Sequence, residues 1–320
     1  MIRRHWKKIL GGILASVIAF ALFGVPYLMA RLVTRAGTRP MDMRLTSAPT
    51  DFGVDFEDVT FSSSDGVELS GWYLGGGDGG LTIACGHGLF RSRREVLDRA
   101  VFFRRLGFDT LVFDFRRHGT SATREKVTLG YDERLDFLGA VDFLKRAHPD
   151  KSVAVYGVSM GAAAALLAAR ASDDVSAVMA DSSFLSIDHT VEHHVELLFG
   201  LPRFPFASTL LFFFQQQAGF DAEDFDLEKA AEALGDRPLL VVAGESDQRM
   251  PAALQRRLFD ASSSPSSRFR SFPDAGHGAA YRTHPDAYEK MLVEFLEEAG
   301  FATRPESRGP EEEDSSPESR

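Results

Sequence analysis

Hydrophobic positions at the start of the globular part of the chain follow the two-residue period of β-strands. Residues 54–61 and 67–74 alternate apolar and polar side chains on either side of Ser64-Asp65-Gly66. Two alternating runs joined by a short glycine-containing turn predict an antiparallel hairpin. We therefore expect this hairpin to open a β-sheet.

Beyond the hairpin, short apolar runs alternate with longer segments of helical pattern. The strand-like runs are 81–85, 109–114, 152–156, 175–180, 237–243 and 268–272, and the helical segments are about 93–106, 131–147 and 160–171. This alternation predicts an α/β fold with a mostly parallel sheet and helices on both faces. The loops that follow the parallel strands should then meet at one edge of the sheet.

The N-terminus has a different pattern. Residues 9–30 contain no charged side chain, and a helix needs about 20 apolar residues to span a bilayer. A cleaved signal peptide is the alternative, because residues 1–8 are positively charged, but Met29-Ala30-Arg31-Leu32 offers no small-x-small cleavage site. We expect an uncleaved single-pass anchor. The denser positive charge on residues 1–8 favours a cytoplasmic N-terminus, with the rest of the chain outside the cytoplasm.

Composition and charge limit the possible partners and indicate where the folded domain ends. The 320 residues have a formal net charge of −10 and no basic face beyond the membrane flank, which argues against nucleic acid as a partner. The single cysteine, Cys85, forms no internal disulfide and fits either redox compartment. Residues 301–320 are acidic and predicted to be disordered. We expect a linker at 31–50 and one domain at 51–300.

The candidate chemistry begins at Gly157-Val158-Ser159-Met160-Gly161, between a predicted buried strand and an alanine-rich helix. Such a sharp strand-to-helix turn needs glycines, because Cβ atoms at those positions would collide. The turn leaves the Ser159 hydroxyl exposed at its apex. A chance match in a glycine-rich chain is the alternative, and the strand–turn–helix context favours a nucleophile.

A serine nucleophile needs a histidine base that is oriented by a carboxylate. Asp247 follows the apolar run at 237–243, and His277 follows the run at 268–272, so both should lie at the sheet edge that carries Ser159. Glu245 is the alternative acid. His87, which follows the strand at 81–85, is expected to bridge loops by hydrogen bonds rather than to act as a second base.

Together these motifs resemble the α/β-hydrolase superfamily. The resemblance rests on His87-Gly88, Asp114-x-Arg116-x-His118-Gly119, Gly157-x-Ser159-x-Gly161, Gly244-x-x-Asp247 and Gly276-His277, and spans about residues 50 to 300. Within the superfamily the chain is similar to the serine aminopeptidase/lysophospholipase-like branch, including Bem46-like membrane-anchored hydrolases. The resemblance implies that the backbone N–H groups of Leu89 and Met160 form an oxyanion hole.

The alternation of strands and helices fails at about 182–226, and the resemblance implies that this insertion is a helical cap over the active site. Its aromatic residues either pack the cap onto the core or bind an apolar group beneath it, and Phe212 to Phe214 could also contact a bilayer. His189 and His193 have a spacing that suits a metal, but a charged outer face of a cap helix explains them better.

We therefore predict a membrane-anchored serine hydrolase that cleaves an ester or thioester with an apolar acyl portion through an acyl-enzyme and needs no cofactor or metal. The expected partners are a small-molecule or lipid-like substrate and the membrane. The alternatives are a serine peptidase or amidase that uses the same triad, and a non-catalytic binding module tethered to the membrane. The physiological substrate and the oligomeric state stay open.

Overall fold

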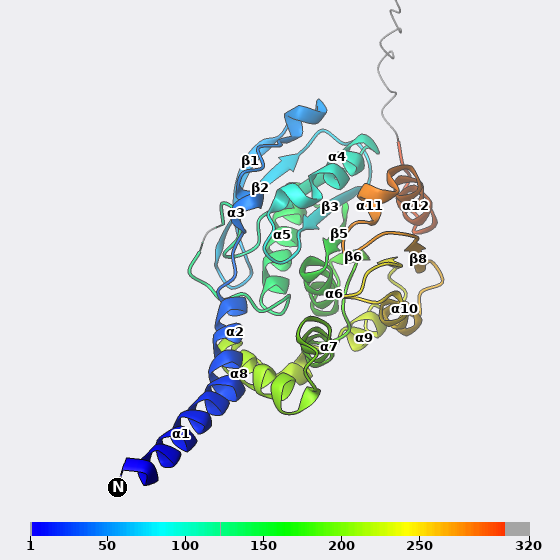
Figure 1. Cartoon of the computed structure of the whole chain (residues 1–320). Helices are drawn as coiled ribbons and strands as arrows, with labels where there is room; N and C mark the ends of the chain where they lie inside the picture. The colour runs from blue at the N-terminus through cyan, green and yellow to red at the C-terminus, as the bar shows by residue number, and fades with distance from the viewer. Residues whose placement is uncertain (1, 122, 305–320) are drawn as a thin grey trace, which may run out of the picture.

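The computed structural model describes residues 2–121 and 123–304. Its centre is one eight-stranded sheet in the order β1-β2-β4-β3-β5-β6-β7-β8 (Figure 1). The strands are β1 Glu57–Ser62, β2 Glu68–Leu74, β3 Leu81–Gly86, β4 Asp109–Phe113, β5 Ser152–Val158, β6 Val175–Asp181, β7 Leu239–Gly244 and β8 Arg268–Phe272. Strand β2 is antiparallel to β1 and β4, and every other neighbouring pair is parallel. The predicted hairpin and mostly parallel sheet are confirmed.

Helices and short helical turns fill the connections. Before β1 lie α1 Ile2–Ala19, η1 Phe20–Gly24, α2 Val25–Thr34, α3 Pro40–Met43 and η2 Pro49–Phe52. Between β3 and β6 lie η3 Arg93–Val96, α4 Leu97–Arg105, α5 Glu133–Ala147 and α6 Met160–Ala171. After β6 come α7 Ile187–Phe199, η4 Arg203–Ala207, α8 Ser208–Ala218, η5 Ala222–Asp224, α9 Leu227–Glu232, α10 Ala252–Ala261, α11 Ala280–Thr283 and α12 Pro285–Glu298.

The sheet is covered on both faces because its central strands are apolar on both. In β5, Val153 and Val155 belong to one buried cluster, whereas Ala154 and Tyr156 belong to the other. The first cluster includes side chains from α5, α6 and α9, and the second includes side chains from α4 and α12. Two apolar faces are what a parallel sheet between two helical layers requires. Because β5, β6, β7 and β8 are parallel, their carboxyl ends lie at one edge of the sheet.

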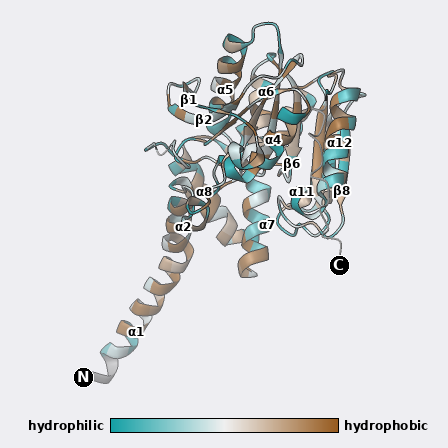
Figure 2. Ribbon diagram, turned by 90° about the horizontal axis from the view of Figure 1, so that it is seen from above, coloured by the Kyte–Doolittle hydropathy of each residue, from teal (hydrophilic) through white to brown (hydrophobic). Residues whose placement is uncertain are grey.

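The N-terminal helix projects from this domain over most of its length, and its last part packs against the domain. His5–Thr34 is long and apolar enough to cross a membrane or to act as a signal sequence, and only 6% of its most apolar window is buried. Its last part, α2, packs along α8 (Figures 1 and 2). The helix continues to Thr34, beyond the predicted end at residue 30 and into the predicted linker. Most of the predicted tail, from residue 305 on, lies outside the described residues.

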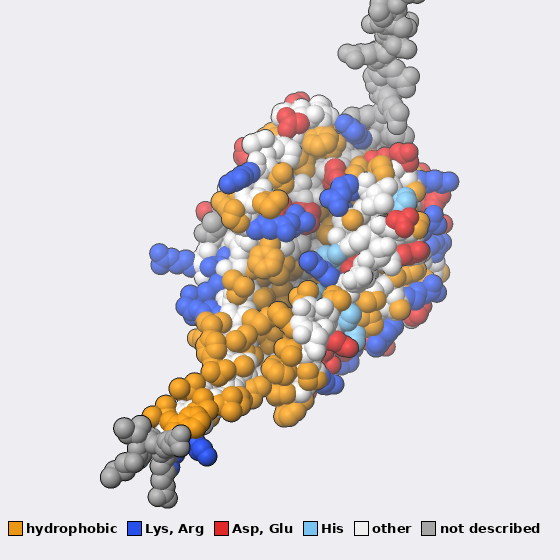
Figure 3. Space-filling model, in the orientation of Figure 1, with side chains coloured by type: hydrophobic (Ala, Val, Ile, Leu, Met, Phe, Trp, Pro, Cys, Tyr) orange, Lys and Arg blue, Asp and Glu red, His pale blue; other side chains and the backbone are white. Residues whose placement is uncertain are grey.

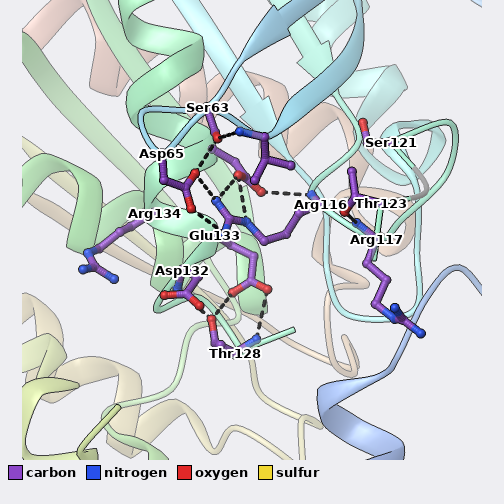
Figure 4. Close-up of polar contacts among 12 residues, drawn as sticks. Ser63, Asp65, Arg116, Arg117, Ser121, Thr123, Thr128, Asp132, Glu133 and Arg134 are labelled. Atoms are coloured by element: carbon purple, nitrogen blue, oxygen red, sulfur yellow. Dashed lines mark hydrogen bonds and ion pairs between the residues drawn. The ribbon is translucent and has the colours of Figure 1, made fainter. Parts of the chain in front are cut away.

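A buried ion network attaches α5 to the start of the sheet. The Arg116 guanidinium donates to Asp136 of α5 at 2.6 and 2.9 Å. It also donates to Asp65 of the β1–β2 turn at 2.9 and 3.0 Å (Figure 4). Arg116 and Asp136 are both buried. Hydrogen bonds from Arg116 and Ser63 outweigh the effect of partial burial and hold the pKa of Asp65 below its usual value. The network joins three segments that are distant in sequence.

Replacing one partner of this network should destabilise the fold. Asp136→Ala leaves the buried guanidinium without its closest carboxylate, and we expect a loss of about 3–5 kcal/mol in the free energy of unfolding. Urea titration followed by circular dichroism measures it. Asp142→Ala, an exposed position on the same helix, is the control and should change little. Equal stabilities for the two variants would contradict this account.

Candidate active site

Ser159 lies at the turn between β5 and α6 in a conformation that is unusual for serine. Its φ is 55° and its ψ is −115°, a region that non-glycine residues enter at an energetic cost. A Cβ atom on Gly157 would lie 2.2 Å from the carbonyl carbon and oxygen of Gly161, and one on Gly161 would lie 2.6 Å from the Gly86 carbonyl oxygen. Both glycines are therefore required for the backbone to turn so tightly.

The structure brings the other two predicted residues to this serine. His277 Nε2 lies 2.9 Å from Ser159 Oγ, and His277 Nδ1 lies 2.8 Å from Asp247 Oδ2. Asp247 Oδ1 accepts hydrogen bonds from the backbone N–H groups of Arg249 and Met250, which fixes the carboxylate. A proton on Nδ1, facing Asp247, leaves Nε2 free to accept the serine proton. The three side chains thus form a continuous hydrogen-bonded chain.

Two further residues, which sequence reasoning missed, support the histidine loop. Ser182 Oγ accepts from the Gly278 N–H at 2.9 Å and donates to Asp181 Oδ1 at 2.8 Å. Tyr288 donates to Asp181 Oδ2, also at 2.8 Å, and burial raises the pKa of Asp181. Asp181 is the last residue of β6 and Ser182 follows it, at the same sheet edge, and that position was their signal in the sequence.

The alternative acid and the second histidine have other partners. Glu245 is exposed and accepts a hydrogen bond from Ser271 Oγ at 2.8 Å. His87 lies 2.8 Å from the Gly88 carbonyl through Nδ1, and its Nε2 accepts from the Phe115 N–H at 3.1 Å. Burial, with a smaller contribution from His118, lowers the pKa of His87 to about 4. His87 is therefore neutral at physiological pH, and these bonds join two loops.

Leu89 and Met160 both line the cavity that contains Ser159 and His277. Met160 is the first residue of α6, so its N–H is among the helix N-terminal donors without an intrahelical acceptor. The loop before Leu89 is fixed by a 2.6 Å hydrogen bond from the Gly88 N–H to Glu95, which also pairs with Arg91 at 3.1 Å. Both residues therefore border the cavity that contains Ser159, and their role as oxyanion donors stays a prediction.

The cavity has a volume of about 540 Å³, within the usual range for small-molecule sites. Besides Ser159 and His277, most of its wall is apolar. Many of the apolar lining residues come from the β3 loop, from α7 and α8, and from α2 of the N-terminal helix: Leu89, Phe90, Val191, Val195, Leu198, Phe199, Leu210, Met29 and Val33. The insertion after β6 thus closes the site on one side and the N-terminal helix on another.

Two of the α7 histidines, His193 and His194, have side-chain partners within the protein. His193 Nε2 lies 2.7 Å from the Gln248 carbonyl oxygen, beside Asp247 in sequence, and Glu192 pairs with Arg203 at 2.8 Å. Within residues 2–121 and 123–304, no three or more His, Cys, Asp or Glu side chains are grouped to hold a metal ion. His193 therefore links α7 to the loop that carries Asp247.

The chain is similar in sequence and in fold to several known proteins. Residues 83–291 match the model of the alpha/beta hydrolase family. The chain is 26% identical to YqkD of Bacillus subtilis over 309 residues, which cover 93% of this chain and 99% of that protein. It is 24% identical to bem46 of Schizosaccharomyces pombe over 263 residues, or 80% and 81% of the two chains. The esterase Pf2001 of Pyrococcus furiosus superposes with a TM-score of 0.64 at 24% identity, covering 79% and 96%.

A single methyl group at the turn should disturb the site. Gly157→Ala would force the start of α6 away from β5, and we expect a loss of about 1–3 kcal/mol in unfolding free energy. Urea titration measures the loss. Gly80→Ala is the control, because no atom lies within 4 Å of a Cβ placed there. Wild-type stability in Gly157→Ala would show that the turn is less constrained than the structure indicates.

Proposed function

Because the chain belongs to the alpha/beta hydrolase family, we propose that it is a serine hydrolase with Ser159 as nucleophile, His277 as general base and Asp247 as the orienting acid. The observation that carries this proposal is the hydrogen-bonded chain from Asp247 through His277 to Ser159, with distances of 2.8 and 2.9 Å. A serine hydroxyl is a weak nucleophile at neutral pH, and such a chain is what activates it.

In the first half-reaction, His277 Nε2 takes the proton of Ser159 as Oγ attacks the acyl carbonyl carbon. The carbonyl oxygen gains negative charge, and the N–H groups of Leu89 and Met160 stabilise it. Asp247 keeps its carboxylate against Nδ1 and stabilises the imidazolium. The tetrahedral intermediate then collapses, the bond to the leaving group breaks, and His277 gives its proton to that group. An acyl-Ser159 ester is left.

In the second half-reaction, His277 removes a proton from water, which attacks the acyl carbonyl carbon. The same two N–H groups stabilise the second oxyanion, and His277 returns the proton to Ser159 Oγ as the acid leaves. Every proton is carried by His277, so the cycle needs no group from outside the chain other than water.

We propose an ester or thioester with an apolar acyl portion as the substrate. The support is the apolar wall of the 540 Å³ cavity, since burial of an acyl chain there is favourable by about 0.8 kcal/mol per methylene. The structurally similar Pf2001 protein is named an esterase, which favours the same chemistry here. Activity on esters but not on aminoacyl amides would separate this proposal from the peptidase alternative.

We also propose that the N-terminal helix is kept as a membrane anchor. Ala30 and Thr34 are buried, the ring of Tyr27 meets Phe213 of α8 edge to face at 5.5 Å, and Gln217 of α8 donates to the Tyr27 carbonyl. If the helix were cleaved off as a signal sequence, the domain would lose these contacts. The cytoplasmic N-terminus and the external hydrolase domain stay predictions from charge; the side chains of residues 1–4 lie outside the described part of the chain.

Ser159→Ala should abolish covalent labelling by a fluorophosphonate probe and lower ester hydrolysis at least about a thousandfold, because the nucleophile is gone. Gel fluorescence and p-nitrophenyl ester assays measure the two effects. Circular dichroism should show an unchanged fold. Persistent labelling of Ser159→Ala, or no labelling of the folded wild type, would refute the assignment.

Asp247→Asn should lower kcat roughly a thousandfold or more, because an amide no longer holds the imidazole in the tautomer that accepts the serine proton. Glu245→Gln, two residues away and bonded to Ser271, is the matched control and should retain activity. Steady-state assays with a p-nitrophenyl ester compare them. A larger loss in Glu245→Gln than in Asp247→Asn would make Glu245 the acid.

A further inference from the structure

The helix pair after β6 has an exposed apolar tip at the end of the molecule where the N-terminal helix leaves it. Helices α7 and α8 meet at a bend of 114°. The side chains of Leu198 and Phe199 at the end of α7 are 60% and 52% exposed, Phe204 in η4 is 79% exposed, and Phe212 of α8 is 54% exposed. A cluster of large apolar side chains in water is costly and marks an interaction surface. We call these four residues the apolar tip.

The apolar tip is continuous with the N-terminal helix. Figure 3 shows hydrophobic side chains running from that helix onto the adjacent end of the domain, up to a hollow in the face of the molecule. Phe214 is only 2% exposed and Phe213 packs against Tyr27. Of the Phe212–Phe214 run, Phe212 is therefore the residue that faces outward.

The length of the free helix places this tip at a membrane boundary. Most large side chains between Ile9 and Leu28 are exposed, and these twenty residues span about 30 Å at about 1.5 Å per residue. The hydrocarbon core of a bilayer is about 30 Å thick. Its near surface would therefore fall close to Tyr27 and Leu28, where α8 packs against the helix.

The substrate cavity reaches the same place. Met29 and Val33 of the N-terminal helix line it together with Leu198 and Phe199 of the apolar tip, and Ser159 lies in the same cavity. Leu198 and Phe199 thus belong both to the outer apolar surface and to the inner wall of the site. This continuity favours a lipid bilayer as the occupant of the surface over a protein partner, because the N-terminal helix already has the length and composition of a membrane span.

We propose that the apolar tip inserts into the leaflet next to the anchor, and that the cavity receives its acyl chain from that leaflet. This inference rests on the proposed hydrolase function and narrows its substrate to membrane-resident esters with long acyl chains. The buried chain would lie along Met29 and Val33, with its ester group at Ser159.

Membrane insertion of the apolar tip can be tested by a measurement that does not depend on enzyme activity, with the full chain in phosphatidylcholine nanodiscs. An environment-sensitive dye on Phe204→Cys should be quenched by lipids that carry a nitroxide on the acyl chain. The same dye on Asp150→Cys, an exposed position before β5 at the opposite sheet edge, should not be quenched. Cys85 is buried and should not react with the dye. Equal, weak quenching at both sites would overturn membrane insertion and leave a protein partner as the occupant.

Leaflet access is tested by comparing two substrates. Phe204→Glu/Phe212→Glu should lower hydrolysis of p-nitrophenyl palmitate in phosphatidylcholine vesicles by at least about tenfold. Hydrolysis of soluble p-nitrophenyl acetate should stay within about twofold, since neither residue lines the cavity. An equal effect on both substrates, or on neither, would overturn the inference. If the wild-type protein hydrolyses neither substrate while the Phe204 dye is quenched, the hydrolase proposal fails and membrane insertion stands.

Discussion

The active-site geometry depends on one backbone constraint, the turn at Ser159. A serine held at φ 55° between β5 and α6 is tolerated only because the chain on both sides lacks side chains where it crosses itself. The contacts that Gly161 allows are with the carbonyl groups of Gly86 and His87, so the turn also sets the position of the β3 loop. That loop carries Leu89. The nucleophile and one proposed oxyanion donor are therefore positioned by the same close approach.

The rest of the site is attached to this turn by hydrogen bonds from neighbouring strand ends. Ser182 holds the backbone of the His277 loop, and its own partner Asp181 is held by Tyr288 from α12. His193 connects the cap helix α7 to the Asp247 loop. A change in any of these supports would move the base or the acid relative to Ser159. The positions of Ser159, Asp247 and His277 thus depend on hydrogen bonds made at this edge of the sheet.

Much of this arrangement could be predicted from the sequence, for identifiable reasons. The strand–helix alternation and the glycines around Ser159 carry local signals, and the order of Asp247 and His277 after apolar runs placed them at one edge. The choice of Asp247 over Glu245 rested on the Gly244-x-x-Asp247 motif of the resemblance, because spacing alone does not say which carboxylate faces His277. The role of Asp181 and Ser182, and the contribution of Met29 and Val33 to the cavity, depend on contacts between distant segments that spacing does not encode.

The central claim is that Ser159 carries an acyl group during turnover. Acid quenching of the protein during hydrolysis of a p-nitrophenyl ester, followed by mass spectrometry of its peptides, tests this directly. We predict an adduct of the acyl mass on the peptide that contains Ser159, and on that residue within it. Ester turnover by the folded protein with no adduct, or with the adduct on another residue, would contradict the account.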